Sequence, residues 1–323
     1  MSKTCFLHVG LHKTASSSFQ ETCAQNSRLL ASLGFDYPLF KCEAANKNKI
    51  ANHSIPLFSL FNENPKKYHV NAKWGIQKSI KEVNLSYEKQ LEIYLQNSNN
   101  LVISGEDISV LSRNSILKLI NKLHQHNFKI KACAIVRSPY SALCSALQQR
   151  IKEGEFIELI SLDDTSPSSF NPQPFKKASH LRKMRDIFGN RISFYDFDDA
   201  CSHIYGPAAF LVQEFLNQDP SDFEYRRINE SRSNFFIRIQ NEFNKTNPAF
   251  VNGRSNPQFQ RIPAMIDKSF RYTGKFLLTK VEHKLIEDFI AEEAHELQAI
   301  TGINFKSNAF KFSKPIFYPL ASP

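Results

Sequence analysis

The chain has 323 residues, of which 41% are hydrophobic and 22% charged, and these ordinary proportions exclude a largely disordered protein. Lys and Arg (41) outnumber Asp and Glu (31), so the net charge of +10 predicts an anionic partner: nucleic acid, an acidic membrane, a nucleotide or an acidic glycan. The first ten residues do not resemble a signal peptide, and no apolar run is long enough to predict a membrane span.

Strand-like and helix-like segments alternate through the first half of the chain. The predicted strands are residues 4–9, 101–104, 130–136 and 191–196. The predicted helices are residues 16–33, closed by Gly34, and residues 87–96, 114–126 and 139–152, whereas residues 40–85 give no clear pattern. Continuous apolar strands separated by helices predict an α/β fold of three layers, a central parallel sheet flanked by helices.

The later part of the chain is predicted to be mainly helical. Its clearest helix covers residues 279–300, begins with a capping box of Thr279 and Glu282, and ends at Gly302. Val281, Leu285, Phe289 and Leu297 are expected on its apolar face. Residues 161–175 and 245–263 are predicted long loops, typical either of lids and binding loops or of surface excursions.

The six cysteines do not form a recognisable site. Their positions are scattered, without C-x-x-C or Cys/His ligand spacing: Cys5, Cys23, Cys42, Cys133, Cys144 and Cys201. We therefore expect small apolar fillers in a reducing cytoplasm, and neither a disulfide framework nor a zinc site.

The first strand runs into a turn of small residues, Gly10-Leu-His-Lys-Thr-Ala-Ser-Ser-Ser18, and then into a helix. Backbone N–H groups at such a helix start bind anions, and Lys13 and the hydroxyls that follow it add donors. His12 stands where a Walker A loop has glycine, which counts against an ATPase or GTPase. The alternative is an ordinary helix N-cap.

A second anion site is predicted where residues 130–136 end in Arg137. Ligands of open α/β sheets bind at the carboxyl ends of strands, so Arg137 and Ser145 of the following helix could grip a second phosphate. The alternative is a strand-end arginine that pairs with a surface carboxylate.

Together the two motifs resemble those of PAPS-dependent sulfotransferases, in particular bacterial-type carbohydrate sulfotransferases. G-x-x-K-T-A-S-S-S resembles the family's 5′-phosphosulfate loop, although Ala15 replaces the usual glycine, and Arg137 with Ser145 resembles its 3′-phosphate motif. Residues 194–198 and 227–231 also resemble the family, so the resemblance spans about residues 3–235.

The resemblance implies a P-loop-like fold in one sulfotransferase domain, residues 1–323. Residues 1–216 would form the α/β core with the PAPS site, and residues 217–323 a mainly helical extension with a basic loop. The implied cofactor-binding residues are Gly10, Lys13, Thr14, Ala15, Ser16, Ser17, Arg137 and Ser145.

Sulfuryl transfer needs a base for the acceptor hydroxyl and positive charge on the leaving phosphate. By the resemblance, Lys13 stabilises the leaving group and Glu106, at the end of residues 101–104, is the base. Asp107 is the second candidate and His12 the third, because imidazoles in general exchange protons near neutral pH. Acids at the start of a helix are the structural alternative. No metal site is required.

Residues 226–275 contain ten basic and three acidic residues, and so hold most of the net charge. They are expected to close over the 3′-phosphate, to line a groove for an acidic glycan acceptor, or to form a solvated basic face. The leading hypothesis is a cytoplasmic PAPS-dependent sulfotransferase that acts on a carbohydrate hydroxyl. The alternatives are a small-molecule kinase of the P-loop type and, more distantly, a basic nucleic-acid-binding protein, for which no recognised motif is present.

Overall fold

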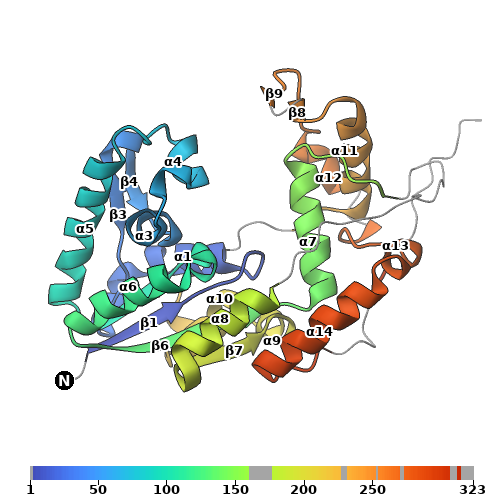
Figure 1. Cartoon of the computed structure of the whole chain (residues 1–323). Helices are drawn as coiled ribbons and strands as arrows, with labels where there is room; N and C mark the ends of the chain where they lie inside the picture. Colours follow the sequence, from blue (N-terminus) through green and yellow to red (C-terminus); the bar gives the residue numbers. More distant parts are fainter. Residues whose placement is uncertain are drawn as a thin grey trace, which may run out of the picture. The chain divides into compact units, whose positions relative to one another are not determined.

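The computed structural model describes residues 3–159, 177–226, 231–251, 254–269, 273–305 and 311–313 (Figure 1). The chain divides into two compact units, the first made of residues 1–137 and 178–228 and the second of residues 138–177 and 229–323. Each unit is described by itself. The single domain with a boundary at residue 216 stays a prediction of the sequence.

The first unit is built on a five-stranded parallel sheet in the order β2-β5-β1-β6-β7 (Figure 1). Its strands are β1 (Lys3–His8), β2 (Phe35–Asp36), β5 (Asn100–Ser104), β6 (Phe128–Val136) and β7 (Ile192–Asp196). The four predicted strands are confirmed. The short edge strand β2 was missed, because two residues carry no periodic pattern.

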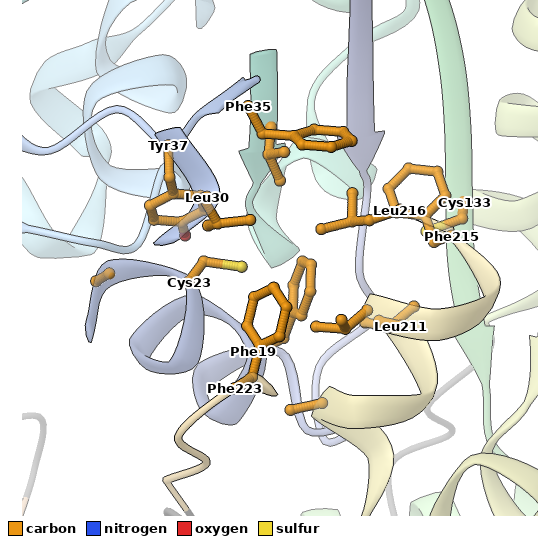
Figure 2. Packing of buried hydrophobic residues seen from close by; sticks show 14 of the residues in the cluster. Phe19, Cys23, Leu30, Phe35, Tyr37, Cys133, Leu211, Phe215, Leu216 and Phe223 are labelled. Carbon is orange, nitrogen blue, oxygen red and sulfur yellow. The ribbon is translucent and has the colours of Figure 1, made fainter. Parts of the chain in front are cut away.

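One face of this sheet is covered by α1 (Ser16–Gln25), α2 (Ser27–Ser32) and α10 (Pro207–Glu214). Figure 2 shows Phe19 and Cys23 of α1 among Leu211, Phe215 and Phe223, and this cluster includes Cys133 of the sheet. The strand residues of opposite parity point to the other face, where α6 (Arg113–Gln125) contacts β6 and α8 (Ala178–Phe188) contacts β7. The predicted three-layer α/β fold is thereby confirmed.

The helix predicted over residues 16–33 is two helices that meet at Asn26. The Asn26 side-chain amide donates to the carbonyl of Thr22 and to that of Glu224, so it binds backbone from a distant segment at the junction. Gly34 follows with a φ of 82°, the left-handed conformation expected for a residue that ends a helix.

Residues 40–85, which gave no sequence pattern, form short elements that frame the site described below. They comprise β3 (Phe40–Cys42), β4 (Lys47–Ile50), α3 (Ser54–Phe61), a 3₁₀ turn (Pro65–Lys67) and α4 (His69–Lys73). The helix predicted over residues 87–96 is longer, α5 (Ile80–Asn97). The remaining helix of the first unit is α9 (Phe197–Ser202).

The second unit is mainly helical, as predicted, with one small hairpin. It contains α7 (Pro139–Lys152), α11 (Asn234–Thr246), α12 (Ala264–Ser269), α13 (Lys280–Lys284), α14 (Glu287–Thr301), β8 (Phe250–Val251) and β9 (Arg254–Ser255). The loop predicted over residues 245–263 includes the β8–β9 hairpin, and the one over residues 161–175 lies outside the described residues.

The predicted helix over residues 279–300 is interrupted between α13 and α14. The capping box of Thr279 and Glu282 is confirmed. The predicted apolar face is wrong at Val281 and Leu285, which are half exposed, because the break near Ile286 changes which side of the helix packs inward. Leu297 is buried as predicted, and Ile286 and Ile290 are buried in place of Val281 and Leu285. In the part of the chain that the structure describes, no helix is long and apolar enough to cross a membrane.

Candidate active site

The loop that follows β1 leads directly into α1 at the centre of the sheet. The Val9 N–H donates to the carbonyl of Cys133 in β6, which ties the start of the loop to the neighbouring strand. Lys13 and Ala15 both have a left-handed backbone, with φ of 70° and 62°, and this turns the chain sharply into the helix at Ser16. The N–H groups of residues 16 and 17 precede the first hydrogen bonds of α1, so they face the position that anions occupy at a helix start.

Ser16 carries the clearest sign of a binding site in this loop. Its hydroxyl is buried and has no hydrogen-bond partner among the described residues. A Cβ added at Gly10 would lie only 2.6 Å from Oγ of Ser16, so this position needs glycine for the two segments to approach. Because a buried hydroxyl without a partner costs free energy, a ligand oxygen at this place would satisfy it.

The hydroxyl of Thr14 is satisfied within the loop itself. It is buried and donates to the carbonyl of Leu11 at 2.5 Å. This bond closes the turn that presents Lys13, so Thr14 shapes the loop whether or not a ligand is present.

Arg137 lies at the carboxyl end of β6, beside the same loop. Its Nη1 donates to the carbonyl of Lys13 at 3.0 Å, and its guanidinium lies 4.5 Å from the ring centroid of Phe197. The chain leaves β1 toward β2 and leaves β6 toward β7, so Lys13 and Arg137 flank the point where the strand order reverses. Ligands of open α/β sheets bind at such points.

A turn with two acids, Glu106–Val110, follows the neighbouring strand β5. The backbone of residues 53 and 54 packs against its start: the His53 N–H donates to the carbonyl of Ser104, and a Cβ on Gly105 would lie 2.7 Å from the Ser54 nitrogen. The Ser54 hydroxyl accepts the Asp107 N–H at 2.9 Å. The turn is therefore held by backbone contacts that only glycine at position 105 permits.

Asp107 is joined to two side chains that come from distant parts of the sequence. Its Oδ1 lies 2.9 Å from Nε2 of His12, and its Oδ2 accepts the hydroxyl of Tyr68 at 2.7 Å. Burial by itself raises the pKa of Asp107, but the hydrogen bonds from His12 and Tyr68 outweigh it and hold that pKa below its ordinary value. Because the carboxylate is ionised, it can only accept hydrogen bonds. The Nε2 atom of His12 therefore carries the proton of this hydrogen bond.

Glu106 is less enclosed than Asp107, with 20% of its side chain exposed. One of its carboxylate oxygens lies 4.0 Å from Nδ1 of His12. His12 therefore stands between the two acids, fixed by one and close to the other.

Next to the loop, the last residues of β1 and β5 are joined by a hydrogen bond between their side chains. Nδ1 of His8 lies 2.8 Å from the hydroxyl of Ser104, and both residues are fully buried. Burial lowers the pKa of His8 to about 4, so its ring is neutral at physiological pH. The loop and the acid turn thus lie above buried residues of the sheet.

Most of the predicted site residues lie in the first unit. The structure places these at the carboxyl ends of β1, β5 and β6: Gly10, His12, Lys13, Thr14, Ala15, Ser16, Ser17, Glu106, Asp107 and Arg137. Ser145 lies on α7 of the second unit, so its pairing with Arg137 stays a prediction. Tyr68 and Ser54 were missed, because they come from the segment that shows no periodicity.

Some of the basic residues of 226–275 form ion pairs within the second unit. Arg238 is buried and bonds both carboxylate oxygens of Glu282, and Arg232 pairs with Asp267. Arg227 and Arg271 lie outside the described residues. At least two members of the segment therefore stabilise the second unit and do not form a free basic face.

The chain matches no protein-family model, and no curated protein is significantly similar to it. Among solved structures, a sulfotransferase from Alicyclobacillus acidocaldarius superposes with a TM-score of 0.41 at 12% identity, over 94% of this chain and 96% of that one. Retinol dehydratase, in complex with androsterone and the inactive cofactor PAP, gives 0.32 at 11% identity, over 97% and 83%. Scores this low do not establish a shared fold.

No metal centre is formed by the side chains in the described ranges. Nowhere in them do three or more His, Cys, Asp or Glu side chains gather in a geometry that could hold a metal ion.

Proposed function

We propose that the chain transfers a sulfuryl group from PAPS to a hydroxyl of a carbohydrate acceptor. The observation that supports this most is the loop after β1, which joins Lys13 to the start of α1 and contains the buried hydroxyl of Ser16 without a partner among the described residues. The acid turn follows β5, the strand paired with β1, so its carboxylates lie near the loop. The resemblance of both sequence motifs to PAPS-dependent sulfotransferases supports the choice of sulfate donor.

The residues of the loop fit a 5′-phosphosulfate group. Gly10 leaves room for Ser16 to approach the loop backbone, and the Ser16 hydroxyl lacks an acceptor that an anionic oxygen would supply. Arg137, at the adjacent strand end, is the residue proposed for the 3′-phosphate, together with Ser145. Since Arg137 also donates to the Lys13 carbonyl, it fixes the loop while it binds.

When bound, PAPS supplies the sulfuryl group and a phosphate leaving group. In our proposal, Glu106 accepts the proton of the attacking hydroxyl, and Lys13 neutralises the charge that grows on the leaving oxygen. Asp107 holds His12 in one orientation beside Glu106.

Glu106 is a better base than Asp107 because the Asp107 carboxylate is committed to other side chains and is the more enclosed of the two. Both oxygens of Asp107 accept hydrogen bonds, and its lowered pKa makes it a weak base. Glu106 is partly exposed, so an acceptor hydroxyl can reach it. His12 is the group that would replace Glu106 if the carboxylate proves dispensable.

Calorimetric titration with PAP, with ATP and Mg²⁺, and with a short oligonucleotide tests the donor. We expect PAP to bind, and Lys13→Ala and Arg137→Ala to weaken it by about tenfold to a hundredfold, because each removes a charged hydrogen-bond donor. Lys118→Ala, an exposed lysine on α6, is the matched control and should leave PAP affinity unchanged.

The same titrations can reject the proposal. Folded wild-type protein that does not bind PAP would overturn it. Tighter binding of ATP with Mg²⁺ would indicate a kinase, and strongly salt-dependent binding of the oligonucleotide alone would indicate a nucleic-acid-binding protein.

A further inference from the structure

A cavity of about 370 Å³ opens in the first unit beside Asp107. It lies between the end of α3, the turn at residues 65–67, and the acid turn after β5. Its volume is in the lower range of pockets that bind small molecules. A ligand there would lie against the turn that carries Glu106.

One wall of the cavity is aromatic and fixed in place. The rings of Phe58 and Tyr68 are stacked, with centroids 4.4 Å apart and planes inclined by 24°. The hydroxyl of Tyr68 is bonded to Asp107, so the ring cannot rotate away without breaking that bond. The wall is therefore preformed, and because Tyr68 is buried while Phe58 is partly exposed, Phe58 is the ring that a sugar can contact.

The cavity is also lined by hydrogen-bonding groups suited to hydroxyls. Asn62 and Asn64 line the cavity, and each amide both donates and accepts. Lys67 also lines it and contributes an exposed ammonium group. Within the described residues, Lys67 takes part in no ion pair, and the acid nearest in sequence, Glu63, instead accepts a hydrogen bond from Ser112.

The charges around this cavity favour an anion at the Lys67 end. The Asp107 carboxylate is compensated by hydrogen bonds from His12 and Tyr68, so its negative charge is already satisfied. The charge of Lys67 is left for a ligand to neutralise. A ligand that carries both hydroxyls and a negative group matches the lining residues Asn62, Asn64 and Lys67.

We propose that this cavity binds the acceptor as a sugar ring that carries a carboxylate or a sulfate group, and that Lys67 binds that group. This inference rests on the proposed function and adds the position and charge of the acceptor. It also moves the acceptor from the basic residues of 226–275, at least two of which are paired, to residues 58–69 of the first unit.

Nuclear magnetic resonance titration with disaccharides tests the cavity directly. The probes are a glucuronic-acid disaccharide with its carboxyl-reduced counterpart, and a sulfated disaccharide with its desulfated counterpart, all added with saturating PAP. We expect at least one anionic probe to bind about tenfold or more tightly than its neutral partner, since a charge-assisted hydrogen bond is lost in the latter. The shifted amide signals should include residues 58–69.

Two lysine variants separate a specific contact from general attraction. Lys67→Gln should remove the preference for the anionic probe, and Lys67→Arg should restore most of it. Lys66→Gln is the matched control, because Lys66 is the adjacent exposed lysine and does not line the cavity. PAP affinity should be the same in all three variants.

Several results would overturn the inference: equal affinities for anionic and neutral probes, an equal loss in Lys66→Gln, signals that shift only outside residues 58–69, or no binding of any probe. These outcomes are independent of the donor. Failure of PAP to bind would reject the sulfotransferase proposal, while the same titrations without PAP would still decide whether the cavity binds an acidic sugar.

Discussion

The two segments that follow the adjacent strands β1 and β5 differ in how their polar groups are satisfied. The loop at residues 10–17 leaves the buried hydroxyl of Ser16 without a partner among the described residues. In the acid turn, the Asp107 carboxylate accepts hydrogen bonds from His12 and Tyr68. The backbone N–H of Asp107 donates to the hydroxyl of Ser54. Equivalent positions in the sheet thus carry one incomplete and one complete set of hydrogen bonds.

This difference separates groups that bind a ligand from groups that hold other side chains in position. An incomplete set costs free energy until a ligand completes it, so the loop is suited to hold an anion. A complete set fixes side chains before any ligand arrives, and preorganised groups of this kind stabilise charge without having to reorient. The comparison assigns binding to the loop and orientation to Asp107.

Glu106→Gln should have the largest effect. The amide keeps the shape of the side chain but cannot accept a proton, so we expect turnover to fall by about 10²- to 10⁴-fold. PAP affinity should change little, because the loop residues are unaltered. Steady-state sulfation assays and calorimetry on the same preparation measure both quantities.

His12→Ala is the comparison that decides between the two candidate bases. If Glu106→Gln retains turnover while His12→Ala loses it, His12 is the base and Asp107 orients it. If both variants retain turnover, neither group is the base and the proposed mechanism is wrong.

The sequence predicted the parts of this site that depend on local pattern. Strands of apolar residues, the helix starts at Ser16 and Pro139, and the small residues between β1 and α1 are all local features, and they placed Lys13, Arg137 and Glu106 at strand ends. Neighbouring carboxyl ends of parallel strands meet at one edge, so these residues were expected to lie together.

What the sequence could not provide comes from segments without periodicity. Tyr68 lies almost forty positions before Asp107 in a polar stretch, and only the chain's three-dimensional path brings its hydroxyl to that carboxylate. The same holds for Arg238, one of the ten basic residues of 226–275, which is buried against Glu282. Net charge along a sequence does not reveal which charges are already paired.

Tyr68→Phe should weaken the acid turn in a pH-dependent way. The Asp107 pKa is lowered in the folded protein, so its ionised form contributes stability above the ordinary aspartate pKa, and this contribution is lost as pH falls through the folded value. Without the Tyr68 hydroxyl, the Asp107 pKa should rise and the protein should lose about 1.5–3 kcal/mol of stability at pH 7.

Urea unfolding of both proteins at neutral and acidic pH measures this effect. The difference in the free energy of unfolding between the wild type and Tyr68→Phe should become smaller as pH falls. Protonated Asp107 is stabilised less by the tyrosine hydroxyl than ionised Asp107 is. A difference that stays constant with pH would indicate that Tyr68 acts through packing on Phe58 and not through Asp107.

The smallest effect, and the sharpest test of the contrast, comes from two hydroxyls in one loop. Ser16→Ala removes a buried group without a partner, so the stability of the unliganded protein should stay the same or rise, while PAP affinity falls by about five- to tenfold. Thr14→Val removes a hydroxyl that is bonded to the Leu11 carbonyl, and should cost about 1 kcal/mol of stability without ligand.

Thermal unfolding with and without PAP measures both changes. If Ser16→Ala destabilises the free protein as much as Thr14→Val does, the Ser16 hydroxyl is satisfied within the folded chain, and the loop was complete before any anion bound.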